Sequence, residues 1–157
     1  MNIQKGLLVK CIAIPLLVGA ASSLISGGGM EMFQSVVKPP LSPPGWMFPV
    51  VWTILYTLMG IGSYLILTSG VDPEQIHEAI TIYGDQLAVN FFWSIFFFNL
   101  EWYLFSFFWL LLLWALVWVM LKLFWQISRT AAYLNVPYLV WLTIAGYLNF
   151  GIWILNR

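Results

Sequence analysis

The sequence predicts an all-α integral membrane protein, a five-transmembrane-helix bundle. Hydrophobic residues make up 62% of the 157 positions and charged residues only 8%, whereas a soluble domain carries about 25% charged residues. Five apolar stretches approach or exceed the roughly 20 residues that a helix needs to cross a bilayer. Helices are expected because an open sheet cannot satisfy its backbone in lipid. No polar stretch is long enough for a separate domain, so residues 1–157 form a single membrane domain.

The five predicted spans are separated by short segments that favour turns. The spans cover roughly 6–26, 45–68, 81–99, 102–126 and 132–155. The first span contains Lys10 and Pro15, but its apolar run is longer than the core of a signal peptide, so we expect it to be retained. The separators are Gly27–Gly29, Ser69–Pro73, Asn99–Glu101 and Ser128–Thr130.

A proline-rich segment, KPPLSPPGWMFPVVW, leads into the second span. Ser42 is expected to cap this helix, with Pro43 and Pro44 in its first positions, where a missing N–H costs nothing. Pro49 falls in the first turn. The preceding prolines keep the chain extended. The segment 27–44 therefore predicts a stiff loop that covers one end of the bundle.

The charged residues give a weak orientation and exclude some functions. Four basic residues lie on one face and two on the other, which favours a cytoplasmic N-terminus. Six basic residues balance six acidic ones, which argues against nucleic-acid binding. Asp72, Glu74, His77 and Glu78 are expected in a solvated loop, and Asp85 near the start of the third span. Short termini without a transit peptide favour a bacterial cell membrane.

The ten tryptophans divide into two groups by depth. Trp46, Trp102, Trp125 and Trp153 lie near span ends, where aromatic belts form. Deeper tryptophans either pack or stack on a flat ligand, because an indole offers an apolar face and one N–H donor. Trp114, Trp118 and Trp125 share a helix face and are expected to pack or to face lipid.

Few polar residues fall inside the spans. Asn90 and Trp93 share one helix face, and Trp141, Ala145 and Asn149 share another. Two interpretations stay open, hydrogen bonding between helices or the lining of a pocket. The residues form no acid pair, catalytic triad or metal site, and the single Cys11 is expected to be a packing residue. Gly84 and Ala88 could serve packing within the chain or a homodimer through the third helix.

Three ordered motifs, together with the proline-rich loop, resemble the translocator protein family, also called the tryptophan-rich sensory protein or peripheral benzodiazepine receptor family. They are PVVWTILYTLMGIGSYL, QLAVNFFWSIFFF and AAYLNVPYLVWLTIAGYLNFGIWILN. The resemblance implies a five-helix bundle with a cavity that binds porphyrins, such as protoporphyrin IX or haem, and synthetic aromatic ligands. It requires no cofactor. The pocket positions that it implies are Trp52, Tyr56, Asn90, Trp93, Phe97, Trp141, Ala145 and Asn149.

The resemblance also implies individual roles and shows two departures. Trp52 and Trp141 match tryptophans linked in bacterial relatives to light-dependent porphyrin breakdown. Ala145 matches a position where a small side chain leaves room for ligand. Leu41 replaces a family tryptophan, and Phe150 replaces a tyrosine of the proposed cholesterol pattern, which argues against sterol binding.

Several functions are compatible with these residues. A membrane receptor or sensor that binds tetrapyrroles and related flat aromatic ligands is favoured, because apolar and aromatic groups with few polar ones suit small-ligand binding. The alternatives are a light- and oxygen-dependent enzyme that degrades protoporphyrin, a porphyrin or sterol transporter, and a scaffold. The sequence shows no inverted repeat or charged midplane residue that would favour transport.

Overall fold

A computed structural model describes residues 3–27 and 29–157, and this part of the chain is all-α, as predicted. It contains six α-helices and one π-helical turn, and no strands. Four of the helices, α1, α3, α5 and α6, are long and apolar enough to cross a membrane. The elements are α1 (Lys5–Ile25), α2 (Gly29–Ser35), α3 (Met47–Leu67), α4 (Pro73–Ser94), η1 (Ile95–Asn99), α5 (Tyr103–Ile127) and α6 (Arg129–Leu155).

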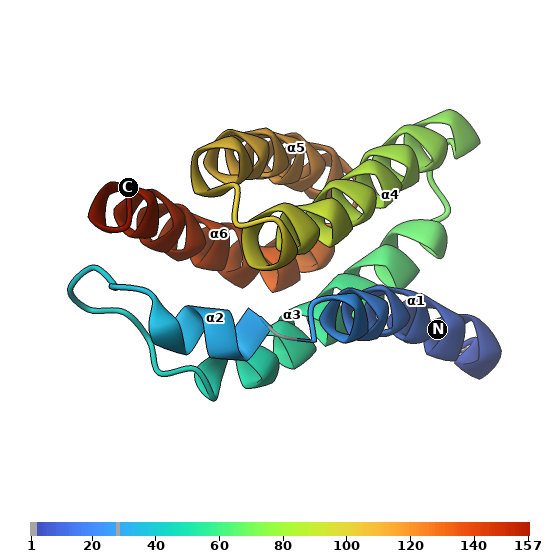
Figure 1. Ribbon diagram of the computed structural model, residues 1–157. Coiled ribbons are helices and arrows are strands. Elements are labelled where there is room, and N and C mark those ends of the chain that lie inside the picture. Colours follow the sequence, from blue (N-terminus) through green and yellow to red (C-terminus); the bar gives the residue numbers. More distant parts are fainter. Residues whose placement is uncertain (1–2, 28) are drawn as a thin grey trace.

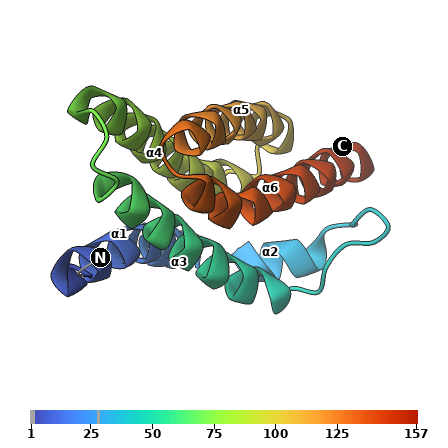
Figure 2. The same cartoon turned by 180° about the vertical axis from the view of Figure 1, so that it is seen from behind.

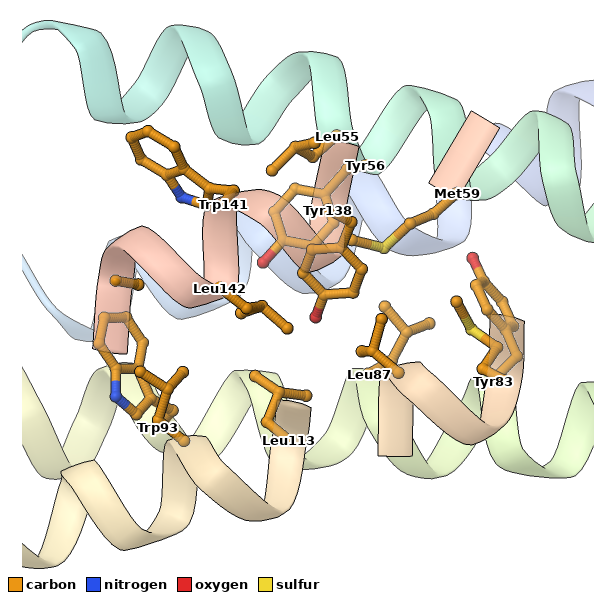
Figure 3. Packing of buried hydrophobic residues seen from close by; sticks show 14 of the residues in the cluster. Leu55, Tyr56, Met59, Tyr83, Leu87, Trp93, Leu113, Tyr138, Trp141 and Leu142 are labelled. Atoms are coloured by element: carbon orange, nitrogen blue, oxygen red, sulfur yellow. The ribbon is translucent and has the colours of Figure 1, made fainter. Parts of the chain in front are cut away.

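The helices form two layers with α6 between them (Figures 1 and 2). α1, α2 and α3 make one layer, α4 and α5 make the other, and α6 packs against both α5 and α3. The core between the layers is apolar, and its side chains are almost fully buried (Figure 3). Large apolar residues also cover the outside, as expected for a surface that faces lipid. The core includes Met59, Ile66, Leu110, Leu113, Val117, Met120, Phe124, Tyr138, Leu142 and Ile152.

A glycine allows α1 and α3 to lie unusually close together. A Cβ atom on Gly60 would stand 2.5 Å from Cα of Ile12 and 2.6 Å from the carbonyl oxygen of Cys11. Only glycine fits such a backbone contact, which is the way that small residues bring membrane helices together. Cys11 is buried and free, in agreement with the packing role predicted for it.

The helix that contains the predicted third span, 81–99, begins before that span. α4 begins at Pro73, so the loop predicted around Glu74, His77 and Glu78 was wrong, and these residues lie on exposed helical turns. Asp85 is exposed in the middle of this helix. Asp72 caps the helix by accepting a hydrogen bond from the Glu74 N–H at 3.3 Å, and Pro73 follows at the first position. Hydropathy did not identify the first half of α4 as helical because its residues are polar.

The predicted cap of α3 was also wrong. The Ser42 hydroxyl donates to the Pro39 carbonyl at 2.6 Å, and α3 begins only at Met47. A helix does not begin at Pro43 because this residue precedes Pro44, and residues before prolines avoid helical backbone angles. Pro49 lies in the first turn, as predicted. The loop 27–44 contains the short helix α2, which was not predicted.

The remaining turns are short. Asn99–Glu101 turns the chain between η1 and α5, as predicted, and Glu101 adopts a positive φ of 54°. Between α5 and α6 only Ser128 is non-helical, so the separator expected over Ser128–Thr130 is shorter than predicted. The Ser128 hydroxyl accepts from the Ala131 N–H at 3.3 Å and caps α6. These tight connections keep neighbouring helices antiparallel.

Candidate functional site: a covered cavity

A cavity of about 560 Å³ lies between α1, α2, α3 and the end of α4. Its size falls within the range of small-molecule sites in proteins. The helix α2 contributes Gly29, Met30 and Phe33, so the segment predicted to cover the bundle forms one wall. The other lining residues are Leu16, Gly19, Ala20, Ser22, Ser23, Ser26, Gly27, Phe48, Pro49, Trp52, Thr53, Tyr56, Asn90, Trp93, Ser94 and Phe98.

Aromatic rings make up much of the wall. Trp52 and Tyr56, one turn apart on α3, stack with their ring centroids 5.3 Å apart. Phe33 of α2 meets Phe48 of α3 edge to face at 4.9 Å. On the opposite side, Trp93 meets Phe98 at 5.9 Å. Such rings offer flat apolar faces that suit a flat aromatic ligand.

The polar side-chain groups of the wall are hydroxyls, one amide and the indole N–H groups of Trp52 and Trp93. Ser22 of α1 and Ser94 of α4 are hydrogen-bonded to each other and join the two helices across the cavity. Asn90 donates through Nδ2 to the Tyr138 hydroxyl at 2.9 Å. Among the described residues that line the cavity, none is charged at neutral pH. The cavity therefore offers shape, apolar contact and a small number of neutral hydrogen-bonding groups, without charge.

Several contacts hold α2 and the proline-rich loop in place. Lys38 donates from Nζ to the carbonyls of Phe33 at 2.8 Å and Val36 at 3.2 Å, which closes the C-terminal end of α2. The Tyr147 hydroxyl of α6 donates to the Pro40 carbonyl at 2.7 Å. Gly151 lies directly against the Pro39 ring, where a Cβ would be 2.6 Å away. The proline-rich loop thus rests on the C-terminal half of α6 (Figures 1 and 2).

The structure brings four of the eight predicted pocket residues together at the cavity: Trp52, Tyr56, Asn90 and Trp93. Phe97 is buried and stacks on Trp93 at 5.2 Å, so it supports the wall from behind. The three predicted residues of α6 do not line the cavity.

Each α6 residue has another position in the core. Trp141 meets Phe48 edge to face at 5.6 Å, and it also lines a shallow apolar groove between α3 and α6. Its indole N–H has no hydrogen-bond partner among the described residues. Ala145 is buried. Asn149 accepts from Trp93 Nε1 and Ser106 Oγ, both at 3.1 Å, and donates to the Tyr103 carbonyl at 2.7 Å. Asn149 therefore fits the hydrogen-bonding interpretation, and contact of these three residues with a ligand stays a prediction.

Sequence reasoning missed the contribution of α1 and α2. Gly19, Ser22 and Ser23 form part of the wall, as do Met30 and Phe33. The run of small residues from Gly19 to Ser23 was the available signal, since small side chains on a membrane helix leave space or allow close approach.

The fold and the site define a helical membrane protein with a covered, largely aromatic cavity inside its bundle. A model of the TspO/MBR family matches residues 11–154, and the chain belongs to that family. It is 36% identical over 157 residues to the tryptophan-rich protein TspO of Chlorobaculum tepidum, covering 99% of both chains. It is 36% identical over 129 residues to the translocator protein of Bos taurus, covering 81% of this chain and 76% of that one. With the tryptophan-rich sensory protein of Cereibacter sphaeroides it shares 33% identity over 126 residues, which is 80% of this chain and 77% of the other.

Proposed function

We propose that this protein is a receptor or sensor that binds tetrapyrroles, with protoporphyrin IX or haem as examples, and related flat aromatic ligands in the covered cavity. The observation that carries the proposal is the cavity of about 560 Å³ with Trp52, Tyr56 and Trp93 in its wall. A planar ring system gains stacking contacts there as well as apolar burial.

The absence of charge in the described lining suggests how a porphyrin would be oriented. Burying a propionate without a partner costs several kcal/mol. The macrocycle would therefore enter the aromatic part, with its propionates at the mouth. Lys38 stands at the cover with Nζ 5.1 Å from the Phe33 ring centroid, and Phe33 lines the cavity. The Nζ donors of Lys38 already bond to the carbonyls of Phe33, Gln34 and Val36, so Lys38 would attract a propionate through its charge rather than through a free N–H.

The proposal includes a fifth crossing and a location. α4 with η1 covers 73–99, which corresponds to roughly 40 Å of helix at about 1.5 Å per residue. This element packs along α5, and its second half is apolar, so it can cross the bilayer with the other four helices. The location that we propose is a bacterial cell membrane.

The test is a titration in the dark. Protein in lipid nanodiscs is titrated with protoporphyrin IX while tryptophan fluorescence is recorded, and the apparent Kd is compared with that of Trp52→Phe. We expect saturable quenching and a Kd about tenfold weaker in the variant, since stacking on one base-sized ring is worth roughly 1–3 kcal/mol. Trp118→Phe is the matched control, because Trp118 is 45% exposed on the outside of α5. Non-saturable quenching, or an identical Kd in Trp52→Phe, would contradict the proposal.

Light-dependent porphyrin breakdown is a second function to measure on the same samples. Trp52 lines the cavity, whereas Trp141 reaches it only through its contact with Phe48. If the protein degrades protoporphyrin IX under light and oxygen, the rate at saturating ligand should fall more in Trp52→Phe than in Trp141→Phe. Equal loss in both variants would place Trp141 in direct contact with the ligand. An unchanged degradation rate in both variants would show that neither indole takes part in the reaction.

A further inference from the structure

A stripe of alternating aromatic and basic side chains runs along the outside of the protein from α5 into α6. All of its members are exposed, and each follows the one before it by three or four residues. Because only Ser128 separates the two helices, which lie side by side (Figure 2), the stripe continues across the turn. The basic aromatic stripe consists of Trp118, Lys122, Trp125, Arg129 and Tyr133.

Each cation of the stripe lies over an aromatic ring. Lys122 Nζ stands 5.4 Å from the ring centroid of Trp118, and Arg129 Cζ stands 5.2 Å from that of Trp125. Tyr133 meets Trp125 edge to face at 5.2 Å, which joins the two helices at this point. A ring face attracts a cation without serving as a conventional hydrogen-bond acceptor. The N–H donors of both cations therefore remain available to an anion.

No acidic side chain on these two helices neutralises the stripe. The sequence contains no aspartate or glutamate from residue 102 to residue 157. The acidic turns belong to α4, which lies against another side of α5, where Trp109 Nε1 donates to the Val89 carbonyl at 2.8 Å. Positions 109 and 125 are about 160° apart around a helix of 3.6 residues per turn. The stripe thus presents positive charge on the side of α5 that faces away from α4.

The stripe also lies at the depth where hydrocarbon gives way to lipid headgroups. It covers the end of α5 and the start of α6, and both helices are long and apolar enough to cross a membrane. Tryptophan and tyrosine rings favour this boundary. Lysine and arginine side chains that start there extend their charged ends toward the headgroups. A lipid phosphate is consequently the anion that meets these two cations in a bilayer.

We propose that the basic aromatic stripe is a binding site for the headgroup of an anionic phospholipid. The phosphate lies between Lys122 and Arg129 and accepts charge-assisted hydrogen bonds from both. The Trp125 indole N–H and the Tyr133 hydroxyl supply neutral donors beside it. A zwitterionic lipid brings its own ammonium group, which the same two cations repel, so it binds less tightly. The site is separate from the covered cavity and does not depend on what the cavity binds.

Native mass spectrometry of the delipidated protein in a neutral detergent resolves the first lipid-binding event and tests this site. Phosphatidylglycerol and phosphatidylcholine with identical acyl chains are titrated separately, so that only the headgroup differs. We expect phosphatidylglycerol to bind about twentyfold more tightly, since each basic residue near an anionic lipid contributes about fivefold. Lys122→Gln and Arg129→Gln should each lower this ratio about fivefold. Trp125→Leu, which removes the ring below Arg129, should lower it about two- to fivefold.

Matched substitutions separate the stripe from the net charge of the protein. Lys5→Gln and Lys10→Gln remove the same charge from exposed positions of α1. They lie at the same end of the bundle, because the Gln4 N–H donates to the Tyr64 hydroxyl near the end of α3 at 3.0 Å. Both variants should keep the wild-type ratio. Lys122→Arg keeps the cation and should keep the ratio as well. Helical circular dichroism of each variant shows that it is folded.

A soluble competitor distinguishes a lipid site from a site for free phosphate. Glycerol 3-phosphate carries the phosphate without acyl chains and should not displace phosphatidylglycerol at millimolar concentration. Displacement would overturn the assignment to a lipid. Equal binding of the two lipids by the wild-type protein, or an unchanged ratio in Lys122→Gln and Arg129→Gln, would overturn the site itself. So would an equal loss in Lys5→Gln and Lys10→Gln, because the preference would then follow net charge alone.

Discussion

Val37 and Asn156, which are 119 positions apart in the sequence, exchange two hydrogen bonds. The Val37 N–H donates to Asn156 Oδ1 at 2.9 Å, and Asn156 Nδ2 donates back to the Val37 carbonyl at 2.8 Å. The side-chain amide thus pairs with the backbone as a neighbouring strand would. This pair ties the proline-rich loop to the end of α6, and the loop continues from α2, which forms part of the cavity wall.

The first prediction concerns this tie. Asn156→Ala removes both hydrogen bonds, and the loop 36–46 should open more often. We expect amide exchange at Val37 to accelerate about tenfold, because each neutral hydrogen bond contributes roughly 0.5–1.5 kcal/mol. Bound ligand should also dissociate faster. Hydrogen exchange read by mass spectrometry measures the first effect and stopped-flow dilution the second. Thr57→Val serves as the control, since the Thr57 hydroxyl bonds only to the Thr53 carbonyl in its own helix. An unchanged amide exchange rate at Val37 would show that the two hydrogen bonds to Asn156 do not hold the loop against α6.

The second prediction concerns the contact between α1 and α3. Gly60→Ala places a methyl group against the backbone of Ile12, which cannot move aside without separating the helices. We expect a loss of about 1–3 kcal/mol in the free energy of unfolding. Denaturation in mixed micelles, followed by helical circular dichroism, provides the measurement. Gly6→Ala is the control, because nothing lies within 4 Å of a Cβ there and alanine favours helix. Equal stability of the two variants would argue against the close approach.

The third prediction concerns Asn149, which joins α4, α5 and α6. Replacing it with leucine leaves the Trp93 indole N–H without its acceptor, whereas the Ser106 hydroxyl still donates to the Tyr103 carbonyl at 3.0 Å. The expected cost is about 1–3 kcal/mol in unfolding free energy, since a buried polar group left unpaired costs roughly that much. Ser106→Ala removes one donor and keeps the acceptor, so it should cost less. If Asn149→Leu proves as stable as wild type, the network does not support the fold.

The fourth prediction concerns association of two chains through α4, which we propose as the homodimer surface. Gly84, Asp85 and Ala88 are exposed on this helix. In a helix that crosses the bilayer, an exposed carboxyl group is costly against lipid, and a second protein surface would shield it. Ala88→Trp should therefore shift a dimer toward monomer in multi-angle light scattering. Val136→Trp, on the exposed side of α6, should leave the mass unchanged. A wild-type protein that is monomeric at all concentrations in nanodiscs would rule this surface out.

The sequence predicted the apolar helices well because hydropathy alone identifies a segment that lipid can surround. The first turns of α4 were predicted to be a loop because Glu74, His77 and Glu78 are polar, whereas the Asp72 cap and Pro73 begin a helix there. The short helix α2 depends on its contacts with the bundle, which no local pattern reveals. Its residues Met32 and Phe33 are buried.

The candidate site was predictable only in part. Aromatic residues and Asn90 on α3 and α4 were found because their chemistry is distinctive and the resemblance pointed to them. The part of the cavity wall formed by Gly19 and Ser22 was not predicted. In a sequence, small residues that leave space for a cavity cannot be distinguished from small residues that let helices pack closely. The partners of Asn149 could not be deduced, because which polar groups meet depends on the rotation of each helix about its axis.

The π-helical turn η1 has a consequence for how the wall of the cavity can vary between relatives. The Leu100 N–H donates to the Ile95 carbonyl at 3.1 Å, five residues back, so this turn holds one residue more than an α-helical turn. Phe98, within the turn, lines the cavity, while Phe97 beside it supports Trp93. Deleting a single residue here would let the helix continue in α geometry and would rotate these rings out of their present positions. A deletion of one residue, with no other substitution, would then change which aromatic rings line the cavity.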